Sequence, residues 1–241
     1  MIVLYRIYQL FVMLPLMLVA TVMTALVASA GCLLGSARWW GYYPPLLWAR
    51  VMCWLTLVRV RVRGRENITD RQSYVFVANH QGAYDIFAIY GYLGHNFRWM
   101  MKQSLEKIPL VGWACKKCGQ VFVDNHSPAA IRRTMEAAES RLAGGMSLVV
   151  FPEGARTFTG QVGRFKRGAY TLAVEFGLPV VPVTIDGAFA VMPRTSKIPR
   201  YGTITLTIHA PIAADDPELI ERSRRAILSS LSNQKETTEQ R

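Results

Sequence analysis

The sequence predicts an α/β domain that follows a membrane-embedded helical anchor. Two observations predict this fold class. A long stretch near the N-terminus carries no charged residue, and from about residue 58 onward strand-like segments alternate with helical ones. Such alternation is typical of α/β folds, in which helices pack on the faces of a sheet. We therefore divide the chain into an anchor, residues 1–58, and a domain, residues 59–241.

The first element is an apolar helix. Residues 7–37 include no charge over 31 positions, whereas about 20 residues suffice to cross the core of a bilayer. We expect Pro15 to kink this helix and Gly31 and Gly35 to mark its end. Ala-Ser-Ala at positions 28–30 resembles a signal-peptide cleavage site. The apolar run is longer than the roughly 7 to 15 residues of a signal core, so we favour a retained helix.

The second element, residues 39–58, is rich in aromatic side chains, as segments at the level of lipid headgroups are. Arg50 in its middle favours a half-buried helix with a snorkelling side chain over a clean crossing. More arginines follow directly, at positions 59, 61, 63 and 65. By the positive-inside rule the domain then faces the cytoplasm, and the expected location is the inner (cytoplasmic) membrane. The sequence leaves open whether the helices span the bilayer or lie in one leaflet.

The rest of the chain alternates strands and helices. We expect strands at residues 58–62, 73–78, 98–101, 119–123, 147–151, 180–185 and 203–208. We expect helices at residues 85–93, 111–117, 128–142, 167–176 and 217–231. The tail after Asn233 is polar, and we expect it to fray.

Charge and cysteine content limit the partners. The net charge is +12, and +7 of it lies in residues 1–65, because seven arginines precede the first carboxylate, Glu66. Since these arginines flank an apolar helix, we expect membrane lipids as partners and no nucleic acid. The four cysteines, at positions 32, 53, 115 and 118, lack the spacing of a zinc site. We expect reduced thiols and no metal.

A histidine and an aspartate stand in the connection that follows the strand at 73–78. The segment reads NHQGAYD, with four residues between His80 and Asp85. Strand ends open onto clefts in α/β sheets, and an imidazole there can accept a proton from a hydroxyl group. A carboxylate bonded to the other ring nitrogen would fix the tautomer. The alternative is a helix-capping aspartate beside a turn histidine. His95, His126 and His209 are given no chemical role.

Three later segments are interpreted together with the His80–Asp85 pair. They read KQSLEKIPLVG from Lys102, FPEGART from Phe151 and VPVTI from Val181, with GRFKRGA from Gly163 between the last two. In this order the chain resembles the glycerophospholipid acyltransferases, above all the bacterial 1-acylglycerol-3-phosphate acyltransferases. The resemblance covers about residues 59–211. It implies a mixed central sheet flanked by helices.

The resemblance also implies roles for single residues. His80 is the implied general base and Asp85 its orienting partner. The implied substrate-binding residues are Lys102, Phe151, Pro152, Glu153, Gly154 and Arg156, and we add Arg164 and Lys166 to them. The implied acyl-positioning residues are Leu105, Pro109, Gly112, Val181 and Pro182.

Two positions depart from the family pattern, and one basic cluster has two interpretations. Ala155 stands where threonine is common, and Asn125 stands where arginine is common, which removes a possible phosphate contact. Arg164, Lys166 and Arg167 can replace that contact. Alternatively, these three side chains form a solvated or membrane-facing basic patch.

The implied reaction transfers a fatty acyl group from a thioester to the sn-2 hydroxyl of lysophosphatidate, giving phosphatidate. The sequence contains no GxSxG elbow, and neither Cys115 nor Cys118 has an evident base partner, so we expect direct transfer without an acyl-enzyme. No cofactor is expected, and acyl carrier protein or coenzyme A carries the acyl group. The acceptor can instead be glycerol 3-phosphate, a lyso-ornithine lipid or another lysophospholipid. A further alternative is a non-catalytic basic membrane module that binds anionic lipid or nucleic acid.

Overall fold

The computed structural model describes residues 2–124 and 126–232. Its helices are α1 (Ile2–Tyr8), α2 (Leu14–Leu34), α3 (Ala37–Trp40), α4 (Tyr43–Leu55), α5 (Tyr84–Tyr92), α6 (Val111–Lys117), α7 (Pro128–Ala143), α8 (Gly168–Glu175), α9 (Ala188–Val191) and α10 (Leu219–Ser229). Its strands are β1 (Val58–Arg63), β2 (Val75–Ala78), β3 (Phe97–Lys102), β4 (Val121–Val123), β5 (Ser147–Val150), β6 (Val180–Asp186) and β7 (Gly202–Ile208). A π-helical turn spans Gln9–Met13, and short 3-10 segments span Arg65–Asn67 and Gln103–Lys107. The expected frayed tail after Asn233 lies outside the described residues.

The strands form one mixed sheet in the order β1-β7-β6-β2-β5-β3-β4. The five strands from β6 to β4 run parallel to one another, whereas β7 is antiparallel to β6 and β1 is parallel to β7. The carboxyl ends of five neighbouring strands therefore meet at one edge of the sheet. The expected mixed sheet is confirmed, and each expected strand and domain helix is present.

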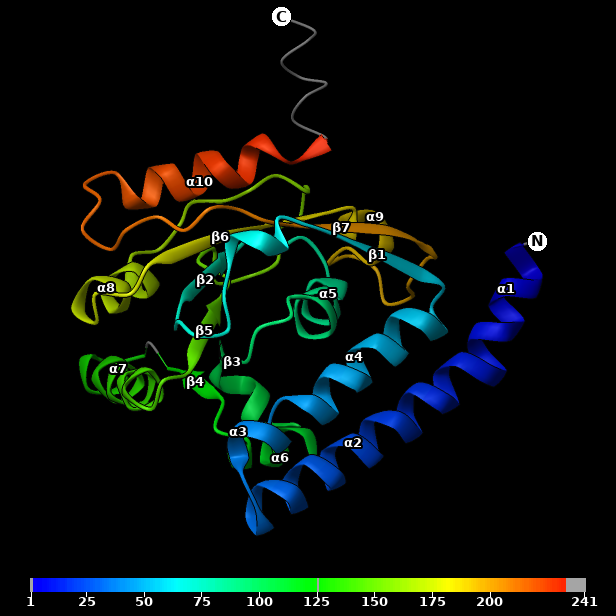
Figure 1. Ribbon diagram of the computed structural model, residues 1–241. Coiled ribbons are helices and arrows are strands. Elements are labelled where there is room, and N and C mark those ends of the chain that lie inside the picture. The colour runs from blue at the N-terminus through cyan, green and yellow to red at the C-terminus, as the bar shows by residue number, and fades with distance from the viewer. Residues whose placement is uncertain (1, 125, 233–241) are drawn as a thin grey trace, which may run out of the picture.

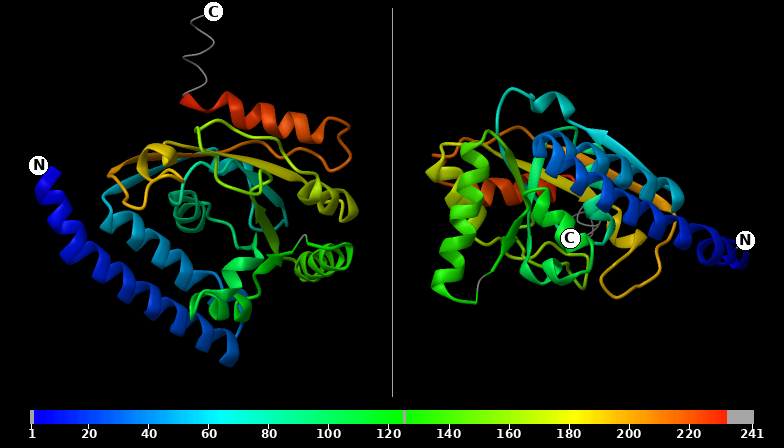
Figure 2. Two further views of the ribbon diagram at one scale, coloured as in Figure 1. Left: turned by 180° about the vertical axis from the view of Figure 1, so that it is seen from behind. Right: turned by 90° about the horizontal axis from the view of Figure 1, so that it is seen from below.

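Helices cover both faces of the sheet (Figure 1). Central β2 is buried along its whole length, as its uninterrupted apolar sequence predicts. Phe76 and Ala78 pack with residues of α5, while Val75 and Val77 pack with residues of α8 and α10. Figure 2 shows the same layers from two further sides, with α4 and then α2 outside α5.

The N-terminal helix is continuous from Val3 to Leu34, and its 32 residues are long and apolar enough to cross a membrane. Pro15 lies in the first turn of α2 and has no N–H to donate. A π-helical turn lies directly before Pro15, and its different hydrogen-bond spacing compensates for the missing N–H donor. This turn stands at the place where we expected a kink. Gly35 ends the helix as expected, and the Trp40 ring lies against Gly31, where a side chain would clash.

Helix α4 packs against the domain with one face. Ala49 and Cys53 are buried in the core beside α5, whereas Leu47 and Trp54 are exposed. Arg50 of this helix is exposed and contacts the end of α5. Its Nε donates a 2.8 Å hydrogen bond to the carbonyl of Gly91, because the last turn of α5 carries partial negative charge. Helix α4 therefore packs as part of the domain core, although the expected anchor included it.

Gly187 forms the turn between β6 and α9, and we expect Gly187→Ala to destabilise the protein. Gly187 has φ +90°, and an added Cβ would lie 2.4 Å from the carbonyl oxygen of Thr203. The backbone strain should lower the free energy of unfolding by about 1 to 3 kcal/mol. Chemical unfolding in detergent measures this loss. Gly168→Ala is the matched control, because no atom lies within 4 Å of its added Cβ. Equal stability of the two variants would contradict the prediction.

Candidate active site

Asp85 organises the turn that follows β2. Its side chain is fully buried, and its Oδ2 accepts hydrogen bonds from the backbone N–H groups of Gln81 at 2.6 Å and Gly82 at 2.8 Å. Position 82 has room only for glycine, because an added Cβ would lie 2.5 Å from the carbonyl oxygen of Ala188. The turn is therefore held by the carboxylate and by close backbone packing.

The same carboxylate oxygen lies 2.7 Å from Nδ1 of His80. Burial raises the pKa of Asp85, while His80 and the two backbone N–H groups oppose this shift. Three donors on one oxygen favour the ionised carboxylate, which can only accept, so the shared proton is placed on Nδ1. Nε2 of His80 then carries the lone pair. The His80 side chain keeps 14% of its surface exposed, so this nitrogen can act as a base.

Phe151, the first residue after β5, covers one face of the imidazole. The rings of Phe151 and His80 are stacked with centroids 3.8 Å apart and an interplanar angle of 6°. Trp99 of β3 stacks against Phe151 in turn, at 5.4 Å. Strands β2, β5 and β3 are neighbours, so this three-ring stack follows from the sheet order.

Glu153 joins the FPEGART segment to the backbone of the histidine. One carboxylate oxygen accepts from the N–H of His80 at 2.8 Å, and the other accepts from the N–H of Gly163 at 2.7 Å. The N–H of Thr157 donates to the carbonyl of His80 at 2.9 Å. Burial raises the pKa of Glu153, and these backbone donors oppose the shift. In the structure, Glu153 holds protein backbone groups with both oxygens.

The basic residues of the same segment lie beside this framework. Arg156 is half-buried, and Arg164 and Lys166 are exposed. The ammonium group of Lys166 lies over Gly154, 2.7 Å from the position a Cβ would take there. Among the described residues, none of these three cations forms an ion pair with a carboxylate. They are therefore available for an anionic ligand. Asn125, the departure from the family pattern, lies outside the described residues.

The second and fourth segments occupy different surroundings. Lys102, at the end of β3, and Leu105 and Pro109 beyond it are exposed. Gly112 is buried, and an added Cβ would meet the carbonyl oxygen of Glu106 at 2.1 Å. Lys102 shares the carboxyl edge of the sheet with His80. Leu105 and Pro109 belong to the β3–α6 connection, and Gly112 lies in the first turn of α6.

Val181 and Pro182 lie inside β6, opposite Phe76 and Val77 of β2. Both are buried, and Val181 belongs to the main core. The structure thus gives them a packing role behind the site.

Sequence reasoning missed Trp99, Thr157 and Gly163. Gly163 opens a quoted motif, but the partners of all three residues become visible only in the assembled sheet.

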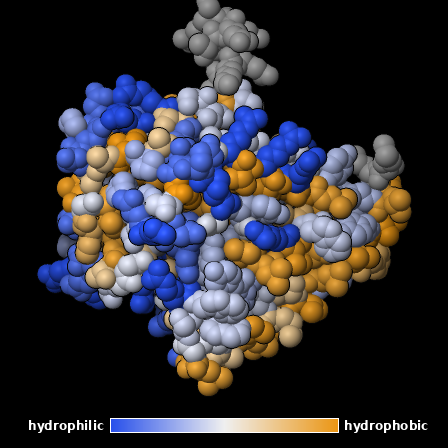
Figure 3. Space-filling model, in the orientation of Figure 1, coloured by the Kyte–Doolittle hydropathy of each residue, from blue (hydrophilic) through white to orange (hydrophobic). Residues whose placement is uncertain are grey.

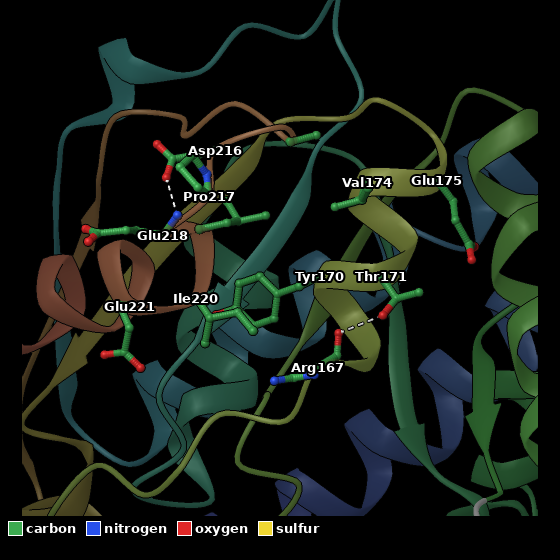
Figure 4. A pocket seen from close by; sticks show the side chains of 12 residues that line it. Arg167, Tyr170, Thr171, Val174, Glu175, Asp216, Pro217, Glu218, Ile220 and Glu221 are labelled. Atoms are coloured by element: carbon green, nitrogen blue, oxygen red, sulfur yellow. Dashed lines mark hydrogen bonds between the residues drawn. The ribbon is translucent and has the colours of Figure 1, made fainter.

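A hollow of about 510 Å³ lies between α8 and the segment that leads into α10, and it shares no residue with the His80–Asp85 pair (Figure 4). Arg167 is its one basic lining residue. Its acidic lining residues are Glu175, Asp216, Glu218 and Glu221. This lining does not suit a phosphate, so the hollow is not assigned to the site.

A second array of side chains has His95 between a serine and an aspartate. Nε2 of His95 lies 2.7 Å from Oγ of Ser147, and its Nδ1 lies 3.5 Å from Oδ1 of exposed Asp70 without forming a hydrogen bond. Ser147 is buried, and its Oγ already accepts from the N–H of Tyr74. A nucleophile needs access to its substrate, so this array serves packing.

Comparison with known proteins agrees with the geometry. The family described as Acyltransferase matches residues 59–186. A chloroplastic 1-acyl-sn-glycerol-3-phosphate acyltransferase of Brassica napus is 32% identical over 193 residues, which are 77% of this chain and 54% of that protein. A 1-acyl-sn-glycerol-3-phosphate acyltransferase of Pseudomonas aeruginosa is 32% identical over 70% of this chain and 66% of its own length. The chain spans about half the length of the plant relatives that it matches.

A solved structure is similar over nearly the whole chain. It is the 1-acyl-sn-glycerophosphate acyltransferase of Thermotoga maritima, with a TM-score of 0.79 and 27% sequence identity. The similarity covers 92% of this chain and 94% of the other. It therefore includes the N-terminal helices as well as the sheet.

We expect the stability of the protein to fall on mild acidification, in part through His95. Burial lowers the pKa of His95 below its ordinary value of 6.5, and Asp70 only partly opposes this shift. The unfolded chain then binds the proton more readily than the folded one. The contribution of His95 to the free energy of unfolding is therefore fully present above about pH 6.5, and it is lost as the pH falls from there towards the lowered pKa.

Unfolding midpoints measured from about pH 7.5 to pH 5.5 test this expectation. His95→Gln should reduce the dependence on pH, while exposed His126→Gln should leave it unchanged. His209, whose pKa burial also lowers, supplies part of the remainder. The prediction is wrong if the two variants show the same pH profile.

Proposed function

This chain belongs to the acyltransferase family, and from that premise we propose that it acylates the sn-2 hydroxyl of lysophosphatidate to give phosphatidate. The acyl group comes from a thioester. The observation that carries the proposal is the His80–Asp85 pair, in which a buried carboxylate holds Nδ1 and leaves Nε2 as an acceptor. The names of the similar proteins support the choice of acceptor.

During the reaction the protein has to take one proton from the acceptor and give it to the leaving group. Nε2 of His80 takes the proton of the acceptor hydroxyl, and the oxygen attacks the thioester carbonyl carbon. The C–S bond then breaks, and the leaving thiolate receives the proton from the imidazolium. Asp85 stabilises that imidazolium while it exists. No acyl-enzyme forms, because the hydroxyl attacks the thioester directly, and the protein's own groups supply the chemistry without a cofactor.

The phosphate of the acceptor is bound by the basic residues beside His80. Arg156 can bond two phosphate oxygens through its planar guanidinium. Arg164, Lys166 and, from the end of β3, Lys102 add positive charge at the same edge. Phe151, Pro152, Glu153 and Gly154 shape this site, and the hydrogen bonds of Glu153 favour a role in holding the loops. Leu105, Pro109, Gly112, Val181 and Pro182 shape the region for the acyl chain.

We infer that the enzyme lies at the inner membrane with the domain facing the cytoplasm. Two features support this location: the helix from Val3 to Leu34 is long and apolar enough for a bilayer, and the arginines of β1 follow later in the chain, as the positive-inside rule requires of a cytoplasmic segment. There the domain meets its lipid acceptor and a soluble donor, either acyl carrier protein or acyl-coenzyme A. The alternative within the same reaction class is another acceptor, such as glycerol 3-phosphate or a lyso-ornithine lipid. Thiol release measured with a panel of acceptors decides among them.

His80→Ala should lower turnover by at least about a hundredfold, because the general base is lost. The assay measures thiol release from an acyl thioester with lysophosphatidate, using protein purified in detergent. His126→Ala is the control, since His126 is exposed on a different loop. Turnover like that of the unsubstituted protein in a folded His80→Ala variant would refute the mechanism. It would favour the alternative of a non-catalytic lipid-binding module.

Arg156→Ala should raise the KM for the acceptor before it affects kcat, because a contact with the phosphate is removed. We expect the KM for the acyl donor to change little. Arg132→Ala on α7 is a matched loss of one exposed arginine outside the site. Acceptor kinetics that are the same in both variants would remove Arg156 from the binding role.

A further inference from the structure

Two exposed segments carry apolar side chains together with positive charge. Phe158, Ile198 and Tyr201 are 63%, 51% and 65% exposed. The basic-aromatic patch, as we define it, consists of these three residues with Arg194, Lys197 and Arg200. Large apolar side chains rarely gather on a free surface without a partner, and none of these cations forms an ion pair among the described residues.

The two segments of the patch are joined to each other. The Arg194 guanidinium lies over the ring of Phe158, 4.2 Å from its centroid. The same guanidinium donates to the carbonyl oxygen of Arg156 at 3.1 Å. The two segments of the patch are therefore in contact, and the patch also contacts the backbone of Arg156, a residue proposed to bind the acceptor.

The patch continues the apolar surface of the N-terminal helix. Gln9, buried within that helix, donates through Nε2 to the carbonyl of Pro199 at 2.8 Å. The rings of Tyr5 and Tyr201 meet edge to face at 5.4 Å. Around these contacts the helix exposes apolar side chains, among them Leu4, Leu10 and Phe11. Apolar residues form a continuous band along the N-terminal helices in Figure 3.

The loop that carries most of the patch also contacts the catalytic turn. Gly82 and Pro193 form a β-bridge, and the N–H of Ala83 donates to the carbonyl of Met192 at 3.1 Å. Gly82 and Ala83 lie between His80 and Asp85 in sequence. A surface on this loop thus has a fixed position relative to the base.

We propose that the basic-aromatic patch is a second lipid contact, which rests in the headgroup region of an anionic leaflet. Aromatic rings and arginines are the side chains that favour this region, and positive charge attracts anionic lipid. An acidic carrier protein would also be attracted by the charge. The exposed Ile198 and Phe158, and the continuity with the N-terminal helix, favour the bilayer. The contact turns the His80 site towards the leaflet that supplies a lysolipid.

Photo-crosslinking in the full chain tests the contact without any need for turnover. The photoreactive residue p-benzoylphenylalanine replaces Phe158 or Ile198, and the protein is reconstituted into vesicles of phosphatidylethanolamine and phosphatidylglycerol. Val174 on α8 and Ile131 on α7 are matched control positions, because both are exposed apolar residues outside the patch. After irradiation, mass spectrometry quantifies phospholipid adducts. We expect adducts at positions 158 and 198 and background amounts at 131 and 174.

A charge variant tests the proposed role of the basic residues. Lys197→Gln combined with Arg200→Gln should lower the adduct yield at position 158 by at least about fivefold, since each basic residue near an anionic leaflet contributes about that factor. Arg132→Gln with Arg133→Gln on α7 is the control with the same loss of charge. The proposal is overturned if lipid adducts at 158 and 198 do not exceed those at the control positions. Adducts that form to added acyl carrier protein instead of lipid would overturn it as well.

Because no outcome depends on acyl transfer, the result is independent of the proposed reaction. An inactive protein that still crosslinks to lipid would refute the reaction and keep the contact. An active protein without lipid adducts at the patch would refute the contact and keep the reaction.

Discussion

The Oδ2 atom of Asp85 accepts three hydrogen bonds inside the protein, and the geometry of the site depends on them. Two come from the backbone of the turn after β2 and one from the imidazole of His80. The other carboxylate oxygen, Oδ1, is buried without a partner among the described residues. A buried charge in this position is tolerated only while its donors stay in place. The turn, the tautomer of the histidine and the direction of its lone pair are thus set together.

The sheet order supplies the remaining constraints. Because β2, β5 and β3 are parallel neighbours, the residues that follow them meet at one edge. Glu153 then joins the turn after β2 to the loop that holds Gly163, with one hydrogen bond from each carboxylate oxygen. The cations of that loop, Arg164 and Lys166, form no ion pair with a carboxylate among the described residues. One acidic residue holds the imidazole of His80, and the other holds the backbone of His80 and Gly163.

Much of this arrangement could be predicted from the sequence, and the rest could not. The alternating pattern located the seven strands and the five expected domain helices to within two residues, but it missed the short helix α9. Spacing suggested the His80–Asp85 pair, because both residues lie in one turn. Contacts between distant segments gave no local signal: Phe151 on the imidazole, Glu153 on the backbone of His80, and Arg50 on the last turn of α5 all depend on the sheet order. The π-helical turn before Pro15 was likewise hidden, since a proline only marks where backbone bonding must change.

The stacking of Phe151 on His80 has a stereochemical consequence. With one face of the ring covered by Phe151 and Nδ1 bonded to Asp85, Nε2 is left as the free acceptor, and its lone pair lies within the plane of the imidazole. A half-turn of the ring would break the bond to Asp85, so the two nitrogens cannot exchange places. An acceptor alcohol would therefore have to bring its hydroxyl into that plane, and the aromatic wall would limit the directions from which it can arrive.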